Sequence, residues 1–258
     1  MKELVDIICA WECHRAERLA LASLVRAQGS SYRRPGARML VCSDGTTTGS
    51  LSGGCLEDAV AHRALDVIRT GAPSLMTFDT RLRFGCNGTI EVFVETVREN
   101  FLAEVATHFR ERRGCRAATV FAGNESELGS RILSAGENAP AGAFVQDLQP
   151  PIQLIIFGSG PDSTPLRSLA EILGWRIIEV DEASDLPARA DKRTAAIIKS
   201  HNYGRDFAAL HRLLQLNLRY VGLLGPRKRR DQLLNALLDA RVSIDSELFG
   251  PAGFDLGA

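Results

Sequence analysis

Two cysteines stand in glycine-rich loops, where a thiol could contact a ligand. Cys55 ends the first glycine loop, Ser50–Cys55, and Cys86 lies within the second glycine loop, Phe84–Gly88. Glycine lets the backbone approach a ligand closely, and a thiolate suits a sulfur-bearing anion or a soft metal. The candidate binding residues are therefore Gly53, Gly54, Gly85 and Gly88, with Cys55 and Cys86 as candidate metal ligands. The alternative is that both cysteines are buried packing residues in glycine turns.

The charge near each thiol differs between the two loops. Cys55 directly precedes a predicted helix, whose N-terminus favours the thiolate. Glu57 and Asp58 in the first turn of that helix oppose this shift, so the net sign stays open. Arg81 and Arg83 precede Cys86 and favour its thiolate form.

An arginine loop, Gln28–Gly36, carries the charge that an anionic ligand would need. Arg33 and Arg34 lie inside it, and Arg38 follows the Pro35-Gly36 turn. Guanidinium groups form paired hydrogen bonds with phosphate, so these residues are candidates for anion recognition. A solvated surface run is the alternative for two of them. The basic run Arg227–Arg230 before a late helix is a second candidate anion site, with a solvated helix start equally favoured.

The second half of the chain contains a phosphate-binding type of turn. Gly158-Ser159-Gly160 follows an apolar strand and precedes a helix, and Asp181 ends the next strand. This order is typical of dinucleotide binding, with Gly158, Gly160 and Asp181 as cofactor contacts. A turn that only packs strand against helix is the alternative. An NAD(P)-dependent oxidoreductase is a further one, with His201 as its candidate acid–base group; a structural histidine is the simpler interpretation.

Hydrophobic periodicity supplies the elements that would position these residues. In the first half it predicts helices over 2–18, 56–69 and 101–112, and strands over 19–27, 39–41, 75–78, 90–94, 117–121 and 131–133. The strand over 90–94 is expected to be half-buried, and Cys9 and Cys13 are expected to pack as small apolar residues of the first helix. In the second half it predicts strands over 152–157, 175–180, 195–199 and 220–224, alternating with helices over 166–173, 206–217 and 229–240.

These elements define an α/β protein of two parts. Strands that alternate with helices indicate a doubly wound parallel sheet. Residues 137–151, rich in glycine, alanine and proline, are the expected boundary. The fold class is thus a small N-terminal α/β domain, residues 1–148, followed by a C-terminal Rossmann-like domain with a doubly wound parallel sheet, residues 149–258.

Composition restricts the class of partner. The 258 residues carry 31 basic and 31 acidic side chains, and 45% are hydrophobic. A neutral chain with no apolar run of about 20 residues predicts neither a nucleic-acid nor a membrane partner. Acidic residues at the N-terminus argue against a secretory signal, which favours a cytoplasmic protein.

The three loops and the turn resemble the XdhC/CoxI family, the accessory proteins of molybdenum hydroxylases. The similar stretches are Gln28–Met39, Ser50–Glu57, Phe84–Gly88, Phe157–Gly160, Ser200–Tyr203 and Tyr220–Gly225. The resemblance implies a chaperone, and no enzyme, for the molybdenum cofactor, as molybdopterin or its cytidine dinucleotide form. Such a protein protects the cofactor, supports its sulfuration by a cysteine desulfurase and inserts it into a hydroxylase.

The resemblance also implies roles and partners. Cys55 and Cys86 would hold the metal–dithiolene end of the cofactor, and Arg33, Arg34 and Arg38 its phosphate. The implied partners are the large subunit of a xanthine dehydrogenase or CO dehydrogenase type of hydroxylase, the desulfurase and a second copy of the chain. A docking protein that touches only the hydroxylase and the desulfurase is a further alternative.

Overall fold

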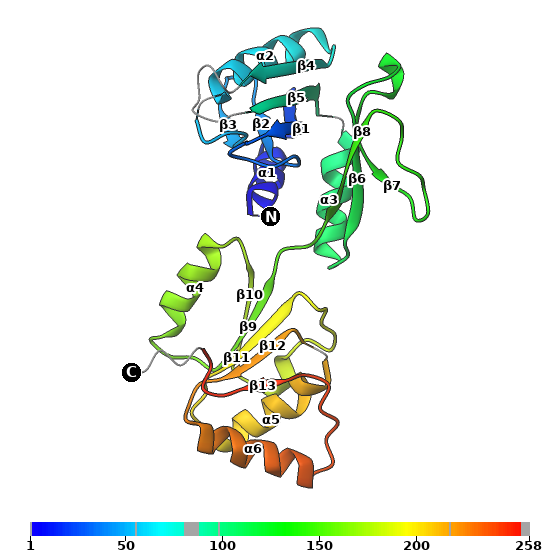
Figure 1. The fold of residues 1–258 in the computed structure, drawn as a ribbon. Helices are drawn as coiled ribbons and strands as arrows, with labels where there is room; N and C mark the ends of the chain where they lie inside the picture. The colour runs from blue at the N-terminus through cyan, green and yellow to red at the C-terminus, as the bar shows by residue number, and fades with distance from the viewer. Residues whose placement is uncertain (1, 55, 80–87, 98, 217, 254–258) are drawn as a thin grey trace. The chain divides into compact units, whose positions relative to one another are not determined.

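The computed structural model describes residues 2–54, 56–79, 88–97, 99–216 and 218–253. Two compact units divide the chain, unit 1 over Met1–Pro150 and unit 2 over Pro151–Ala258 (Figure 1). Along the described chain, no helix has both the length and the apolar character that crossing a bilayer requires.

Unit 1 is built on an antiparallel sheet in the order β3-β2-β1-β5-β4. Its strands are β1 (Ala20–Gly29), β2 (Arg38–Val41), β3 (Thr47–Gly49), β4 (Ser74–Asp79) and β5 (Gly88–Thr96). Helix α2 (Glu57–Thr70) covers one face, and α1 (Lys2–Cys13) and α3 (Glu99–Arg110) pack against the other. Val60, Ala64 and Val67 of α2 are buried, and Gly71 ends the helix in a left-handed conformation.

A second, three-stranded sheet completes unit 1, in the order β7-β6-β8. Its strands are β6 (Cys115–Val120), β7 (Gly129–Leu133) and β8 (Ala143–Leu148). Phe121 beside this sheet packs on Val25 and Phe93 of the first sheet. The prediction that β5 is half-buried is therefore wrong, because the second sheet covers the face that carries Phe93 and Glu95.

The division between the units falls after Pro150, within the segment 137–151, and β8 of that segment pairs antiparallel with β6 in unit 1. One further expectation for unit 1 is corrected. The first helix ends at Cys13 and not near Arg18, and both Cys9 and Cys13 are exposed. These thiols lie outside the apolar stripe of Leu4, Ile8 and Trp11, so they do not pack as core residues.

Unit 2 is the doubly wound domain that the alternating pattern predicts. Its sheet is parallel throughout, in the order β10-β9-β11-β12-β13. The strands are β9 (Gln153–Phe157), β10 (Arg176–Val180), β11 (Thr194–Ile198), β12 (Tyr220–Leu223) and β13 (Leu248–Phe249). Helix α4 (Ser163–Ile172) packs on one face, and α5 (Tyr203–Leu213) and α6 (Arg227–Asp239) on the other. The α/β fold class with a Rossmann-like second part is thus confirmed.

The order of strands fixes where a ligand would lie in unit 2. After β9 the chain goes to β10 on one side and then to β11 on the other. Ligands of such sheets bind at the carboxyl ends of the strands around this reversal. Both the Gly158–Gly160 turn and the segment 199–202 after β11 are located there.

Candidate functional site

The arginine loop contacts the first glycine loop. A Cβ atom added to Gly53 would lie 2.9 Å from Cε1 of Tyr32, so the tyrosine ring rests directly against the glycine backbone. Gly53 has a φ of 94°, in the region that favours glycine. The backbone conformation therefore favours glycine at position 53, and the absence of a side chain leaves room for the Tyr32 ring.

The second glycine loop joins the same region through its last residue. Gly88 is paired with Gly29 of β1, at the start of the arginine loop. A Cβ atom at Gly88 would lie 2.4 Å from the carbonyl oxygen of Gln28 and 2.5 Å from that of Ser30. Described residues from all three loops thus meet at the end of β1. Cys55, Gly85 and Cys86 themselves, like Arg81 and Arg83, lie outside the described residues.

Glu57 organises the first glycine loop. Its carboxylate accepts hydrogen bonds from the hydroxyls of Ser50 (2.8 Å) and Ser52 (2.6 Å). It also accepts from the backbone N–H groups of Leu51, Ser52, Gly53, Gly54 and Leu56, at 2.8–3.1 Å. The backbone N–H groups of the loop therefore form a nest, and the anion that they bind is the Glu57 carboxylate.

The hydrogen bonds decide the charge state of Glu57. Burial raises its pKa, but the bonds from Ser52, Ser50 and Leu51 outweigh that effect and hold the pKa well below its usual range. Glu57 is thus anionic at neutral pH. The N–H groups of Gly53 and Gly54 donate to Glu57, which sequence reasoning treated only as a negative charge beside Cys55. An acidic residue at the first helical position after Ser-x-Ser-Gly-Gly was the signal that could have revealed this role.

The three arginines of the predicted anion site occupy different environments. Arg33 pairs with Glu3 of α1, and Arg34 is exposed. Arg38 is only 4% exposed, at the first position of β2. The role of each in ligand binding stays a prediction.

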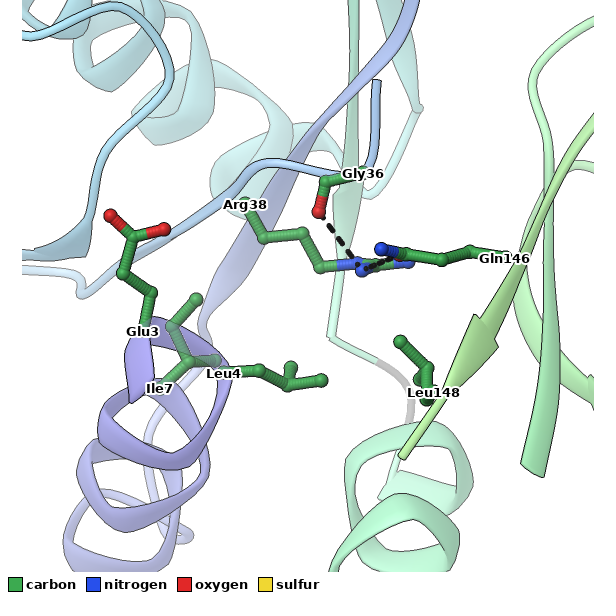
Figure 2. A pocket seen from close by; sticks show the side chains of 7 residues that line it. All are labelled: Glu3, Leu4, Ile7, Gly36, Arg38, Gln146 and Leu148. Carbon is green, nitrogen blue, oxygen red and sulfur yellow. Dashed lines mark hydrogen bonds between the residues drawn. The ribbon is translucent and has the colours of Figure 1, made fainter. Parts of the chain in front are cut away.

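Arg38 borders a small pocket in unit 1 (Figure 2). One Nη atom donates to the carbonyl oxygen of Gly36 at 3.2 Å and to Oε1 of Gln146 on β8 at 2.7 Å. The guanidinium lies over the ring of Phe101, 5.8 Å from its centroid. Burial lowers the pKa of Arg38 to about 10, which leaves it protonated at neutral pH. The pocket has a volume of about 60 Å³ and is lined by Glu3, Leu4, Ile7, Gly36, Arg38, Gln146 and Leu148.

The turn of unit 2 makes internal contacts at the residues predicted to bind a cofactor. The N–H of Ser159 donates to Oδ1 of Asp181 at 2.9 Å, and Arg205 pairs with the same carboxylate at 3.3 Å. A hollow of about 150 Å³ beside the turn is lined by residues that include Gly158, Gly160 and Asp181. The predicted three residues are therefore neighbours, and whether they bind a ligand stays a prediction.

Sequence reasoning missed a buried lysine under this turn. Lys199 is 2% exposed, and its Nζ lies 3.0 Å from Oδ1 of Asp162. A lysine at the end of the apolar segment Ala195–Lys199 was the available signal. His201 nearby is exposed and has a φ of 55°.

The basic run Arg227–Arg230 is the first turn of α6 and does not form an open cluster of cations. Arg229 pairs with the buried Asp206 at 2.6 Å, and Arg230 pairs with Asp231 at 2.7 Å. Both guanidinium groups therefore already have an anionic partner within unit 2. Among the described residues, no group of three or more histidine, cysteine or acidic side chains could hold a metal ion.

Comparisons with known proteins match both units. The model of the XdhC and CoxI family matches residues 13–79, and that of the XdhC Rossmann domain matches residues 154–258. A Bacillus subtilis protein described as a probable subunit of xanthine dehydrogenase is 29% identical, over 94% of this chain and 88% of that protein. The molybdenum cofactor insertion chaperone PaoD of Escherichia coli is 26% identical, over 80% of this chain and 66% of that protein.

A solved structure matches nearly the whole chain. The crystal structure of a protein described as a xanthine dehydrogenase from Bacillus halodurans has a TM-score of 0.74 and 27% identity. The match covers 97% of this chain and 90% of that one.

Proposed function

Because the chain belongs to the XdhC and CoxI family, we propose that it binds the molybdenum cofactor and delivers it to a xanthine dehydrogenase type of hydroxylase. The protein acts as a maturation factor and does not turn over a metabolite. Its relative PaoD is an insertion chaperone for this cofactor, which supports the proposal.

One observation carries the proposal to particular residues of this chain. The arginine loop contacts Gly53, which lies two positions before Cys55, and pairs with Gly88, which lies two positions after Cys86. Loops that are far apart in the sequence thus bring their described residues to one end of β1. A shared site for the two thiols is the simplest use of this arrangement.

The chemistry of these residues fits the cargo. The cofactor has a thiophilic metal–dithiolene end and a phosphate end. We assign Cys55 and Cys86 to the metal end, and Arg33, Arg34 and Arg38 to the phosphate end. A cytidine form would offer a nucleotide to Gly158, Gly160 and Asp181 of unit 2. Sulfuration by a cysteine desulfurase, docking on the large subunit of the hydroxylase and a homodimer complete the proposal.

The test measures bound pterin. The chain is purified from cells that make the cofactor, and the pterin is oxidised to its fluorescent form and quantified per protein. Wild type is expected to retain close to one pterin per chain. Cys55→Ala and Cys86→Ala are each expected to retain at least about tenfold less, since each removes a metal-binding thiolate.

Cys9→Ala is the matched control, because Cys9 is an exposed thiol of α1. It is expected to retain pterin like wild type. Wild type without pterin would contradict the proposal, as would full retention in both loop variants. A wild type that binds hydroxylase and desulfurase without any pterin would instead identify a docking protein.

A further inference from the structure

Arg38 is a buried cation without an anionic partner among the described residues. Its hydrogen-bond acceptors are a carbonyl oxygen and a side-chain amide oxygen, both neutral. Its Nε atom is buried and has no hydrogen-bond partner within the described chain. Burial of a charge and of a donor without compensation is unfavourable, and a bound anion is one group that would compensate both.

The nearby carboxylates are engaged elsewhere. Glu3 lines the pocket but pairs with Arg33. Glu95 acts on Arg38 only through its charge, while its two oxygens accept from the hydroxyl and the N–H of Ser130. Neither of these two carboxylates forms an ion pair with Arg38. The guanidinium of Arg38 is therefore available to an anion that enters the pocket.

The pocket has the form of a site for one small charged group. Figure 2 shows the guanidinium of Arg38 and the amide of Gln146 on one side, with the side chains of Leu4 and Leu148 below them. The volume of about 60 Å³ is compatible with a small group such as a single oxyanion. Glu3 is the acidic side chain of the lining, and because it pairs with Arg33, it leaves the charge of Arg38 uncompensated.

We propose that this pocket binds one phosphate group, held by the guanidinium of Arg38 and the amide N–H₂ of Gln146. A guanidinium presents paired donors that match the geometry of phosphate. The phosphate can be free inorganic phosphate or the phosphate end of a bound cofactor, and only the second source rests on the proposed function. In either case the ligand neutralises the charge that Arg38 brings into unit 1.

The first experiment uses inorganic phosphate and the cofactor-free chain. Isothermal titration at constant ionic strength, with chloride as the reference anion, gives the dissociation constant. Wild type is expected to bind one phosphate per chain. Arg38→Met is expected to weaken binding by at least about tenfold, the loss that one charge-assisted hydrogen bond represents. Arg131→Met on β7 is the matched control, because Arg131 makes an exposed ion pair with Glu137.

A second variant guards against misfolding of Arg38→Met. Leu4→Phe leaves Arg38 intact and adds bulk at the pocket lining. It too is expected to weaken phosphate binding by about tenfold or more, as a filled pocket excludes the ligand. A wild type that binds no phosphate beyond chloride would overturn the proposal, and so would unchanged binding in both variants.

Pterin retention separates the two sources. If Arg38→Met loses both inorganic phosphate and pterin, the pocket holds the phosphate of the cofactor. If it loses inorganic phosphate and keeps pterin, the pocket holds free phosphate. Both results support the pocket, whereas the cysteine variants test the proposed function separately.

Discussion

Glu57→Gln is expected to lower the free energy of unfolding of unit 1 by about 2–4 kcal/mol. The carboxylate accepts hydrogen bonds from the hydroxyl of Ser52 at 2.6 Å and from the amides of Gly54 and Leu56 at 3.0 and 3.1 Å. A glutamine has one acceptor oxygen and turns an N–H₂ group toward the remaining donors. Several N–H groups would then lose their partner or face another donor.

The two tryptophans of the chain allow each unit to be followed separately. Trp11 lies in unit 1 and Trp175 in unit 2. In a Trp175→Phe background, urea unfolding followed by tryptophan fluorescence therefore reports on unit 1. Asp58→Asn is the matched control, since Asp58 is an exposed carboxylate in the same turn of α2. Its effect is expected to stay within about 0.5 kcal/mol.

The dependence on pH follows from the direction of the shift. The pKa of Glu57 lies below its unfolded value in the folded state, so the unfolded chain takes up the proton first. The stabilisation by Glu57 is complete above the unfolded pKa of about 4.3 and is lost progressively as the pH falls below it. The difference between wild type and Glu57→Gln is therefore expected to be constant from pH 6 to 8, roughly, and to shrink below about pH 4.

The same variant bears on the proposed site. Gly54 and Leu56, the two neighbours of Cys55, both donate their N–H groups to Glu57. Loss of these bonds would release the chain on both sides of the thiol, so pterin retention is expected to fall together with stability. Glu57→Gln with wild-type stability would show that the amide nest does not depend on the charge of Glu57.

The parallel sheet of unit 2 was predictable because its evidence is local. β9 reads Gln153-Leu154-Ile155-Ile156-Phe157 and is buried throughout, as expected for a strand covered on both faces. An α-helix follows each of β9, β11 and β12, so the topology follows from the order of the elements. Unit 1 was harder, because the second sheet comes from residues after β5 and covers Phe93 and Glu95. The sequence of β5 alone does not show whether its second face is exposed to solvent or buried by another sheet.

Some features of the candidate site could likewise be predicted from local sequence, and others could not. The close contacts at Gly53 and Gly88 could be predicted from the glycines of the loop motifs. The burial of Arg38 could not be predicted, because Gln146, which holds it, lies 108 residues further along the chain. The sequence indicated one anion site for Arg33, Arg34 and Arg38, whereas Arg38 is the buried one of the three. The number of arginines was visible in the sequence, but their different environments depend on tertiary packing.

Asp206→Asn is expected to lower the free energy of unfolding of unit 2 by about 3 kcal/mol, the lower end of the range for a broken buried ion pair. The Asp206 side chain is 1% exposed and pairs with Arg229 at 2.6 Å. It also accepts a hydrogen bond from the hydroxyl of Ser200. Arg229 keeps 23% of its side chain exposed, so water can solvate part of the charge that loses its partner. This partial solvation is why the lower end of the range applies.

A Trp11→Phe background leaves Trp175 as the fluorescent reporter of unit 2 during urea unfolding. Asp231→Asn is the matched control, because Asp231 makes an exposed ion pair with Arg230 and is expected to contribute about 0–1 kcal/mol.

Arg229→Met added to Asp206→Asn is expected to recover part of the lost stability, since it removes the cation that residue 206 no longer neutralises. If the double variant is less stable than Asp206→Asn alone, Arg229 stabilises unit 2 through its packing and not through this ion pair. The segment 199–202 would then be held after β11 by the Ser200 hydrogen bond to residue 206, without help from α6.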